Sequence, residues 1–423
     1  MGSDKDYLAA AMAQVLVLPE RFPFTIMDVS ALLVFIVTFV VAARFLKTVK
    51  NPGNLPPSVP GGWPLLHHMP TLFKKDFHLE LDKWARELGD VYHISQNSER
   101  PFDVSADLTT AVGNVICALV FGKRFDYGDT RFQYLQATMK NLGAELVKWK
   151  APFVTYIPKG EYAIQDPVAG LRFHAKKLQQ FIREEIDQHR LNLDPEDPRD
   201  FIDYCLLQLD QQDGVGTWLK EDNVVYIIQD LFIAGTDTTA ATLTWALLYM
   251  VLYPDVQAEL DSVLGATKPS LAHREQLPYT IATVMEAQRI RHIAPVLFLR
   301  QADESSSLRG FDIAKGTILF PNLRSVHMDP AAWPDPEVFD PSRFQDADGK
   351  VVNNPPSFLP FSAGRRNCLG EQLAKMELFL LFSTILQHFA LKLPEGAPTP
   401  STEGIFKSLS MAPAPFQLCA VSR

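Results

Sequence analysis

The sequence has few cysteines for its length and no strongly basic stretch. Only four cysteines occur among 423 residues, at positions 117, 205, 368 and 419, and none forms a CxxC pair. They are too few to staple a chain of this size, so we expect a reducing compartment for the main domain and no zinc finger. The net charge is −9, which argues against nucleic acid as a partner. No internal repeat is present.

Apolar residues are abundant instead. Hydrophobic residues make up 47% of the chain and charged residues 21%, as in folded globular proteins. The chain also contains 28 phenylalanines. This number indicates either a bulky apolar interior or an apolar ligand, and composition alone does not choose between them.

The N-terminal extension, residues 1–50, contains an uncharged apolar stretch at 29–43. Extended to 26–46 it has about 20 residues, the length that crosses a hydrocarbon core of ~30 Å. We therefore predict a transmembrane helix here, with a buried core helix as the alternative. Basic residues follow the span, which predicts a cytoplasmic location for the rest of the chain. Residues 51–66 contain five prolines and predict a stiff hinge.

The remainder, residues 67–423, is predicted to be one mainly α domain with small β-sheets. Apolar residues at three-and-four spacing predict helices. These helices are expected at 79–88, 171–186, 223–252 and 372–386. Residues 310–319 predict a hairpin with its turn at Lys315–Gly316, and the prolines between 321 and 360 predict ordered coil.

The strongest chemical signal is the loop at residues 360–370, PFSAGRRNCLG. Cys368 precedes a helix that we expect to begin near Glu371, so N–H groups and the helix dipole would favour a thiolate. Gly364 and Gly370 permit tight turns and close approach to a ligand. The alternative is a buried free cysteine in a glycine-rich loop.

Two other residues complete this loop. Arg366 supplies a fixed cation, and Phe361 can shield the sulfur from water. With Gly364, Cys368 and Gly370 they form the pattern FxxGxRxCxG. Because of this pattern the chain resembles a microsomal cytochrome P450 of the animal group that oxidises foreign compounds and lipids. The resemblance extends over nearly all of the chain from Asn51. It implies the P450 fold and heme b as cofactor, with Cys368 as the iron ligand.

A second segment, AGTDTT at 234–239, lies in a long apolar helix. Thr238 and Asp237 can relay protons to bound oxygen, and the Thr238 hydroxyl can also bond within the helix. We expect Gly235 to let the helix pass close to a flat cofactor. Threonines packed in a core are the alternative.

A third segment places Glu286 and Arg289 three residues apart, on one helix face. A surface ion pair is the simple interpretation of this spacing. In the family the pair locks to an arginine of the later coil, and Arg343 has the matching position here. The resemblance therefore implies a structural role for all three.

The run from Pro295 to Arg300 passes beside the heme in similar proteins, with Arg300 at a heme propionate. A buried strand with an exposed arginine is the alternative. Five side chains are expected to contact substrate. They are Phe232, Ala234, Val296, Leu297 and Phe406.

The match to the family breaks after Ile94. Only residues 95–99 separate it from Arg100, where the family has roughly 80 residues more, about seven mean-length helices. The absent part includes a helix that binds a heme propionate, so the fold is predicted to be incomplete, with a deletion near 95–100. A real variant and a faulty gene model explain the gap equally well.

The resemblance implies a monooxygenase of the endoplasmic reticulum membrane, anchored by a single span. It would hydroxylate a fatty acid, steroid or xenobiotic with O2, taking electrons from NADPH through a flavoprotein reductase. One alternative is an inactive membrane protein of the same fold. Another is an enzyme that rearranges its substrate without added electrons, which the acid–alcohol pair Asp237–Thr238 disfavours.

Overall fold

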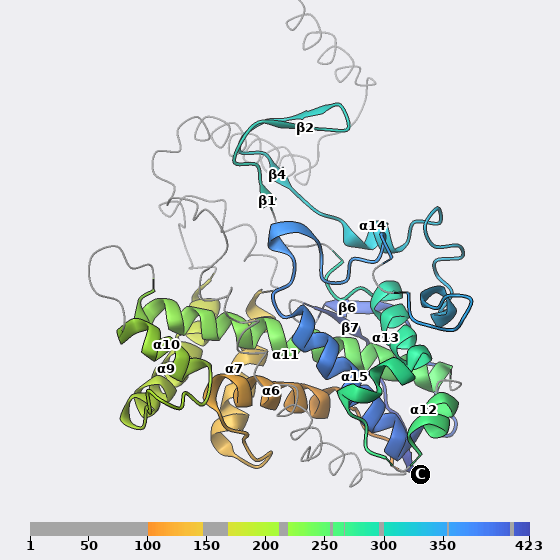
Figure 1. Cartoon of the computed structure of the whole chain (residues 1–423), viewed down its shortest axis with the longest axis horizontal. Helices are drawn as coiled ribbons and strands as arrows, with labels where there is room; N and C mark the ends of the chain where they lie inside the picture. Colours follow the sequence, from red (N-terminus) through yellow and green to blue (C-terminus); the bar gives the residue numbers. More distant parts are fainter. Residues whose placement is uncertain are drawn as a thin grey trace, which may run out of the picture. The chain divides into compact units, whose positions relative to one another are not determined.

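The computed structural model describes residues 100–146, 168–210, 219–253, 257–265, 267–295, 300–352, 355–406 and 410–423 (Figure 1). All of them belong to one compact unit, Leu65–Arg423. The predicted span at 26–46, the hinge at 51–66 and the junction after Ile94 lie outside the described residues. No helix within the described ranges is long and apolar enough to cross a membrane.

The described part is mostly helical, as the sequence predicted. The α-helices are α6 (Ser105–Phe121), α7 (Thr130–Leu146), α9 (Ala169–Leu191), α10 (Phe201–Asp210), α11 (Glu221–Leu252), α12 (Gln257–Leu264), α13 (Pro278–Ile290), α14 (Leu323–His327) and α15 (Glu371–His388). Short 3₁₀ helices are η2 (Leu271–Gln276), η3 (Pro341–Phe344) and η4 (Gly364–Arg366).

The strands form four antiparallel pairs. They are β1 (Arg300–Gln301) with β4 (Ile318–Leu319), β2 (Ser306–Leu308) with β3 (Phe311–Ile313), β5 (Phe389–Lys392) with β8 (Cys419–Ser422), and β6 (Gly404–Phe406) with β7 (Met411–Pro413).

Helix α11 organises these elements. It is 32 residues long and carries Glu221 and Asp222 in its first turn, where acidic side chains interact favourably with the positive end of the helix dipole. It ends at Leu252, because the residue before Pro254 disfavours helical angles. Its most extensive packing is against α6, and it also contacts α9, α13, α15 and β7. From Thr239 to Met250 every residue is buried, so this half of the helix lies inside the protein.

Two apolar clusters meet along α11. One joins the C-terminal half of α11 with α13, α15, β5 and β8. The other joins its N-terminal half with α6, α7, α9 and α10. In Figure 1, α15 lies alongside α11, and its run from Glu377 to Leu386 is buried throughout. The cysteine loop is therefore anchored to a helix that is fixed in the core.

The hairpin predicted at 310–319 is wrong in its pairing. The turn is present, since Thr317 N–H donates to the Ala314 carbonyl oxygen at 3.1 Å and Gly316 has φ +87°. However, β3 pairs backward with β2, and β4 pairs with β1. The predicted coil at 321–360 is correct for most of its described residues, although it contains the short helices α14 and η3.

Candidate active site

The loop before α15 is held by its own backbone. Gly364 has φ +78°, a conformation that side chains disfavour, and it begins the 3₁₀ turn η4. Asn367 N–H closes this turn on the Gly364 carbonyl oxygen at 3.1 Å. Cys368 N–H donates to the Phe361 carbonyl oxygen at 2.8 Å. These bonds fix the cysteine three residues before Glu371, where α15 begins.

Cys368 is exposed, unlike the other cysteines. Cys117 and Cys205 are buried in the apolar cluster of α6, α9 and α10, and Cys419 is half-buried. Burial raises the pKa of Cys205 to about 12, so this thiol is inert. Because all four cysteines of the chain are described, Cys368 is the only exposed one available to an external ligand.

The electrostatics of Cys368 differ in part from the sequence prediction. Although the residue is exposed, adjoining atoms shield its sulfur from water and raise the pKa of the thiol. A hydrogen bond from Gly370 N–H lowers the pKa, as predicted, while the Glu371 carboxylate raises it. The net direction is upward, so the loop by itself does not make a thiolate. A cation bound at the sulfur would provide the remaining stabilisation.

The surroundings of the sulfur fit a flat apolar group that carries acidic substituents. A side chain at Gly370 would begin 4.0 Å from Cys368 Sγ, so the glycine keeps that side open. Leu369 is 46% exposed and offers an apolar surface, while Arg366 is an exposed cation. Phe361 is half-buried, with the Lys375 ammonium 5.6 Å from its ring centre. A heme, which is flat and apolar and carries acidic propionates, fits these surroundings.

Both proton-relay residues predicted on α11 form hydrogen bonds. Thr238 Oγ1 donates to the Ala234 carbonyl oxygen at 2.6 Å, the helix-internal bond that the sequence predicted. Ser410 Oγ donates to Asp237 Oδ2 at 3.4 Å and comes from the loop before β7. Ala234 is exposed on this helix, so its methyl group remains available to a ligand.

Two residues of α11 for which we expected ligand contacts pack against α6. A Cβ on Gly235 would lie 2.7 Å from Ile116 Cδ1, so the glycine lets α6 approach closely. Phe232 is 1% exposed and stacks on Phe121 of α6 with ring centres 5.2 Å apart, so it lies in the core. Helical periodicity could not separate these faces, because α11 is apolar on several sides.

The other predicted contacts lie farther along the chain. Phe406 ends β6 and is 57% exposed. Arg300 begins β1 and is half-buried. Val296 and Leu297 lie outside the described residues.

Sequence reasoning missed one acid beside the relay segment. Glu377 of α15 is 3% exposed and is hydrogen-bonded to Thr239, the neighbour of Thr238. Burial holds the pKa of Glu377 well above its ordinary value, and the Thr239 bond opposes this only in part. Burial therefore favours the protonated, neutral form of this carboxyl group. The signal in the sequence is a lone acid within the apolar run of α15.

The three residues predicted to be structural are brought together. Arg289 donates two hydrogen bonds of 2.7 Å to the Glu286 carboxylate, and both side chains are fully buried. Arg343 Nε lies 3.6 Å from Glu286 Oε1. Arg289 also donates to the carbonyl oxygens of His327, at 2.8 Å, and Pro336, at 2.9 Å. The cluster thus ties α13 to the coil that leads toward Cys368.

The comparisons agree with this geometry. The family pattern described as Cytochrome P450 matches residues 57–420. The chain belongs to the cytochrome P450 family. The cofactor of this family is heme b, in agreement with the prediction from the cysteine loop.

Among P450 relatives, human cytochrome P450 2U1 is 41% identical over 77% of this chain and 61% of its own length. Cytochrome P450 2D6 of Pan paniscus is 41% identical over 81% of this chain and 70% of its own length. The chain therefore spans about three fifths of the P450 2U1 sequences that it matches.

Solved P450 structures share the fold. A zebrafish cytochrome P450 with abiraterone has a TM-score of 0.73 and 28% identity, over 85% of this chain and 81% of that one. A zebrafish cytochrome P450 with progesterone has a TM-score of 0.74 and 30% identity, over 84% of this chain and 81% of that one.

Proposed function

We propose that this chain is a heme-thiolate monooxygenase that hydroxylates a lipophilic substrate with O2 and electrons from NADPH. The observation that carries the proposal is the Cys368 loop. It holds the one exposed cysteine of the chain on a fixed backbone at the start of a core helix. Family membership supports the same chemistry.

Residues of the loop and of β1 would hold the cofactor. Cys368 Sγ would bind the heme iron, and Arg366 and Arg300 are the cations suited to its propionates. The open face left by Gly370 and the apolar Leu369 suit the macrocycle. When bound, the heme activates oxygen, because the thiolate donates electron density that favours O–O cleavage.

The protein's own part is to move protons and to position substrate. Thr238 Oγ1 donates a hydrogen bond to Ala234 O, so its oxygen lone pairs remain able to accept a hydrogen bond from a neighbouring donor. Ser410 limits the rotation of the Asp237 carboxylate. Asp237 and Thr238 can then pass protons from solvent toward the exposed face at Ala234.

The substrate belongs to the apolar class of fatty acids, steroids and xenobiotics. The zebrafish structures contain abiraterone and progesterone, which favours a rigid apolar molecule of steroid size. Ala234, Val296, Leu297 and Phe406 are the proposed substrate contacts. They are apolar, and Ala234 and Phe406 are exposed.

Electrons would arrive from an NADPH-dependent flavoprotein reductase at the endoplasmic reticulum membrane. Residues 26–46 would anchor the chain by a single span, with the catalytic domain in the cytoplasm. Alkaline extraction of membranes tests this anchor. The full chain should stay in the pellet, and the chain without residues 1–50 should be released.

The test of the function is product formation from a panel of lipophiles by the full chain with reductase, lipid and NADPH. Oxygenated product that needs both NADPH and reductase is expected. Product formed without NADPH would identify a rearranging enzyme instead. If the protein takes up no heme and forms no product, the inactive alternative is correct.

A further inference from the structure

Helix α15 carries a carboxyl group in the middle of its buried part. Glu377 opens the run from Glu377 to Leu386, in which every residue is buried, and it is 3% exposed. Within the described ranges no ion pair of Glu377 is found, and its Oε1 has no hydrogen-bond partner there. An apolar side chain of similar shape would avoid the cost of burying a polar group. The presence of a carboxyl group at this position therefore needs a reason other than stability.

A hydrogen bond from α11 reaches the Glu377 side chain. It comes from Thr239, which is 4% exposed and adjoins the relay residue Thr238. The buried residues around this bond belong to the apolar cluster that α11 and α15 share. Apolar contacts have no direction, whereas a hydrogen bond weakens steeply when its two groups move out of line. One polar group within an apolar helix interface can therefore fix the register of the two helices.

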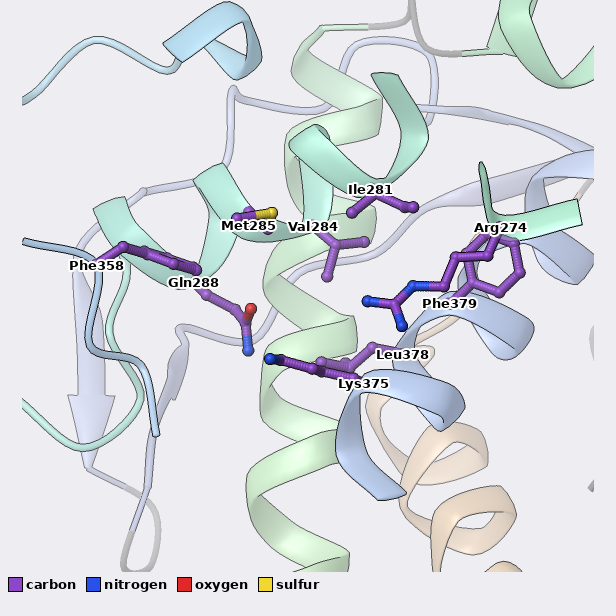
Figure 2. Close-up of a pocket in the computed structure, with 9 residues that line it drawn as sticks. All are labelled: Arg274, Ile281, Val284, Met285, Gln288, Phe358, Lys375, Leu378 and Phe379. Carbon is purple, nitrogen blue, oxygen red and sulfur yellow. The ribbon is translucent and has the colours of Figure 1, made fainter. Parts of the chain in front are cut away.

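The side of α15 that faces α13 is less completely packed. Figure 2 shows that α15 turns Lys375, Leu378 and Phe379 toward α13. A hollow of about 50 Å³ remains between the two helices at this place. Because well-packed interiors contain few voids larger than a water molecule, packing against α13 leaves α15 some freedom. We therefore expect the register of α15 to depend on its contact with α11.

This register determines where the sulfur of Cys368 lies. Helix α15 begins at Glu371, three residues after the cysteine, and the loop is fixed by its own backbone bonds. A shift of α15 along α11 would carry the cysteine with it, while Thr238 would stay with α11. A displacement of ~1 Å at a reacting centre can lower the rate by about 10²-fold. The bond between Glu377 and Thr239 joins the helix that carries the cysteine to the helix that carries the relay.

We propose that Glu377 is a positioning residue, whose hydrogen bond with Thr239 holds Cys368 at a fixed distance from the relay residue Thr238. The neutral form of the carboxyl group suits this role, because an ionised group would be left in apolar surroundings without a counter-charge. No proton transfer is assigned to Glu377. This inference rests on the proposed monooxygenase function, since it gives the residue a part in the same site.

Infrared difference spectra of the purified full chain test the bond without turnover. Wild type minus Glu377→Gln should show the carbonyl stretch of a protonated carboxyl group. Thr239→Val should shift this band to higher frequency, because the hydrogen bond is lost. Thr244→Val is the matched control, since the buried Thr244 hydroxyl bonds the Ala240 carbonyl oxygen within α11, and it should leave the band in place. Absence of the band, or an unmoved band in Thr239→Val, would overturn the proposal.

Product formed per NADPH consumed, in the reductase-supported reaction, measures the positioning. Glu377→Leu should lower this ratio about tenfold with the substrate KM within twofold, whereas its free energy of unfolding should not fall, because leucine suits an apolar core. Glu377→Gln keeps a hydrogen-bonding group and should stay within threefold of the wild type. Adding Thr239→Val to Glu377→Leu should cause no further loss, since both remove the same bond.

Two negative outcomes of this measurement have different meanings. A folded Glu377→Leu variant that couples NADPH to product as well as the wild type does would overturn the positioning role and leave the proposed function intact. The same holds if Glu377→Gln loses as much coupling as Glu377→Leu. No product from the wild type would instead contradict the proposed function, and the positioning role with it.

Discussion

At the scale of single residues, Cys368 differs from the other three cysteines of the chain in its exposure. Shielding raises the pKa of its thiol although Gly370 N–H opposes this. The sequence could identify the residue, because the pattern FxxGxRxCxG leaves one cysteine in a turn before a helix. It could not give the net pKa direction, which depends on how far neighbouring atoms exclude water.

Thr238 gives a prediction for the proton relay. In Thr238→Ala the hydroxyl is lost, so product per NADPH consumed should fall at least tenfold and peroxide should rise. Thr238→Ser keeps a hydroxyl able to donate to Ala234 O and should stay within threefold of the wild type. Tight coupling of NADPH to product in the alanine variant would refute the relay role. Peroxide and product are measured in the same reductase-supported reaction.

The buried Glu286–Arg289 pair gives a prediction for stability. Glu286→Gln leaves the Arg289 guanidinium buried without its counter-charge, which should lower the free energy of unfolding by about 3–5 kcal/mol. Arg183→Gln is the matched control, since Arg183 pairs with Asp222 at an exposed position and should change the free energy by less than ~1 kcal/mol. Urea unfolding measures both. Equal effects would show that burial of the pair is unimportant.

At the scale of secondary-structure elements, a histidine joins the end of α9 to the start of α10. His189 Nδ1 donates to the Glu185 carbonyl oxygen at 2.7 Å, so that nitrogen carries a proton. Its Nε2 lies 2.9 Å from Asp200 Oδ2, which can only accept when ionised. A second proton on Nε2 satisfies both bonds, and the ring is then a cation at a helix C-terminus.

The charges around this histidine are balanced without a metal. Asp203 is held by two hydrogen bonds from Arg199, of 2.7 Å and 3.0 Å. His189, Asp200 and Asp203 otherwise place their ligand atoms within 4.8 Å of one another. Because Asp203 is paired with the Arg199 guanidinium and Asp200 with the His189 imidazolium, the two carboxylates need no metal cation.

This arrangement predicts a stability that falls as the pH rises. Burial disfavours the imidazolium, but the bond to Asp200 and its charge prevail and raise the pKa of His189. A raised histidine pKa stabilises the fold fully below the unfolded value near 6.5, and the contribution is lost as the pH rises through the folded pKa. His189→Asn should therefore cost roughly 1–2 kcal/mol at pH 5.5 and much less at pH 9.

Unfolding free energies at the two pH values measure this difference. His174→Asn on the same helix is the control and should give the same small change at both. A pH-independent effect of His189→Asn would show that the ring is neutral throughout.

The sequence predicted some elements closely and others poorly. Helices α9, α11 and α15 were expected at 171–186, 223–252 and 372–386, and each begins within two residues of that start. Their apolar spacing and their terminal residues are local signals. Pairing of β3 with β2, and packing of Gly235 against Ile116, depend on neighbours distant in the chain, which local periodicity does not encode.

At the scale of the whole molecule, the chain has the P450 fold and spans only part of the length of its relatives. It covers 61% of human cytochrome P450 2U1, while the zebrafish structures still superimpose with TM-scores of 0.73 and 0.74. The described core around α11 and α15 is therefore retained. The predicted deletion after Ile94 would remove a propionate-binding helix, so cofactor retention is the property most at risk.

The carbon monoxide difference spectrum of the reduced, purified full chain tests the central claim, that Cys368 is the thiolate ligand of a heme. The wild type should show the strongly red-shifted Soret band of a thiolate-ligated heme, and Cys368→Ala, folded by circular dichroism, should lose it. Cys419→Ala should leave the band unchanged. A wild type without bound porphyrin, or a Cys368→Ala variant with an unaltered band, would contradict the account.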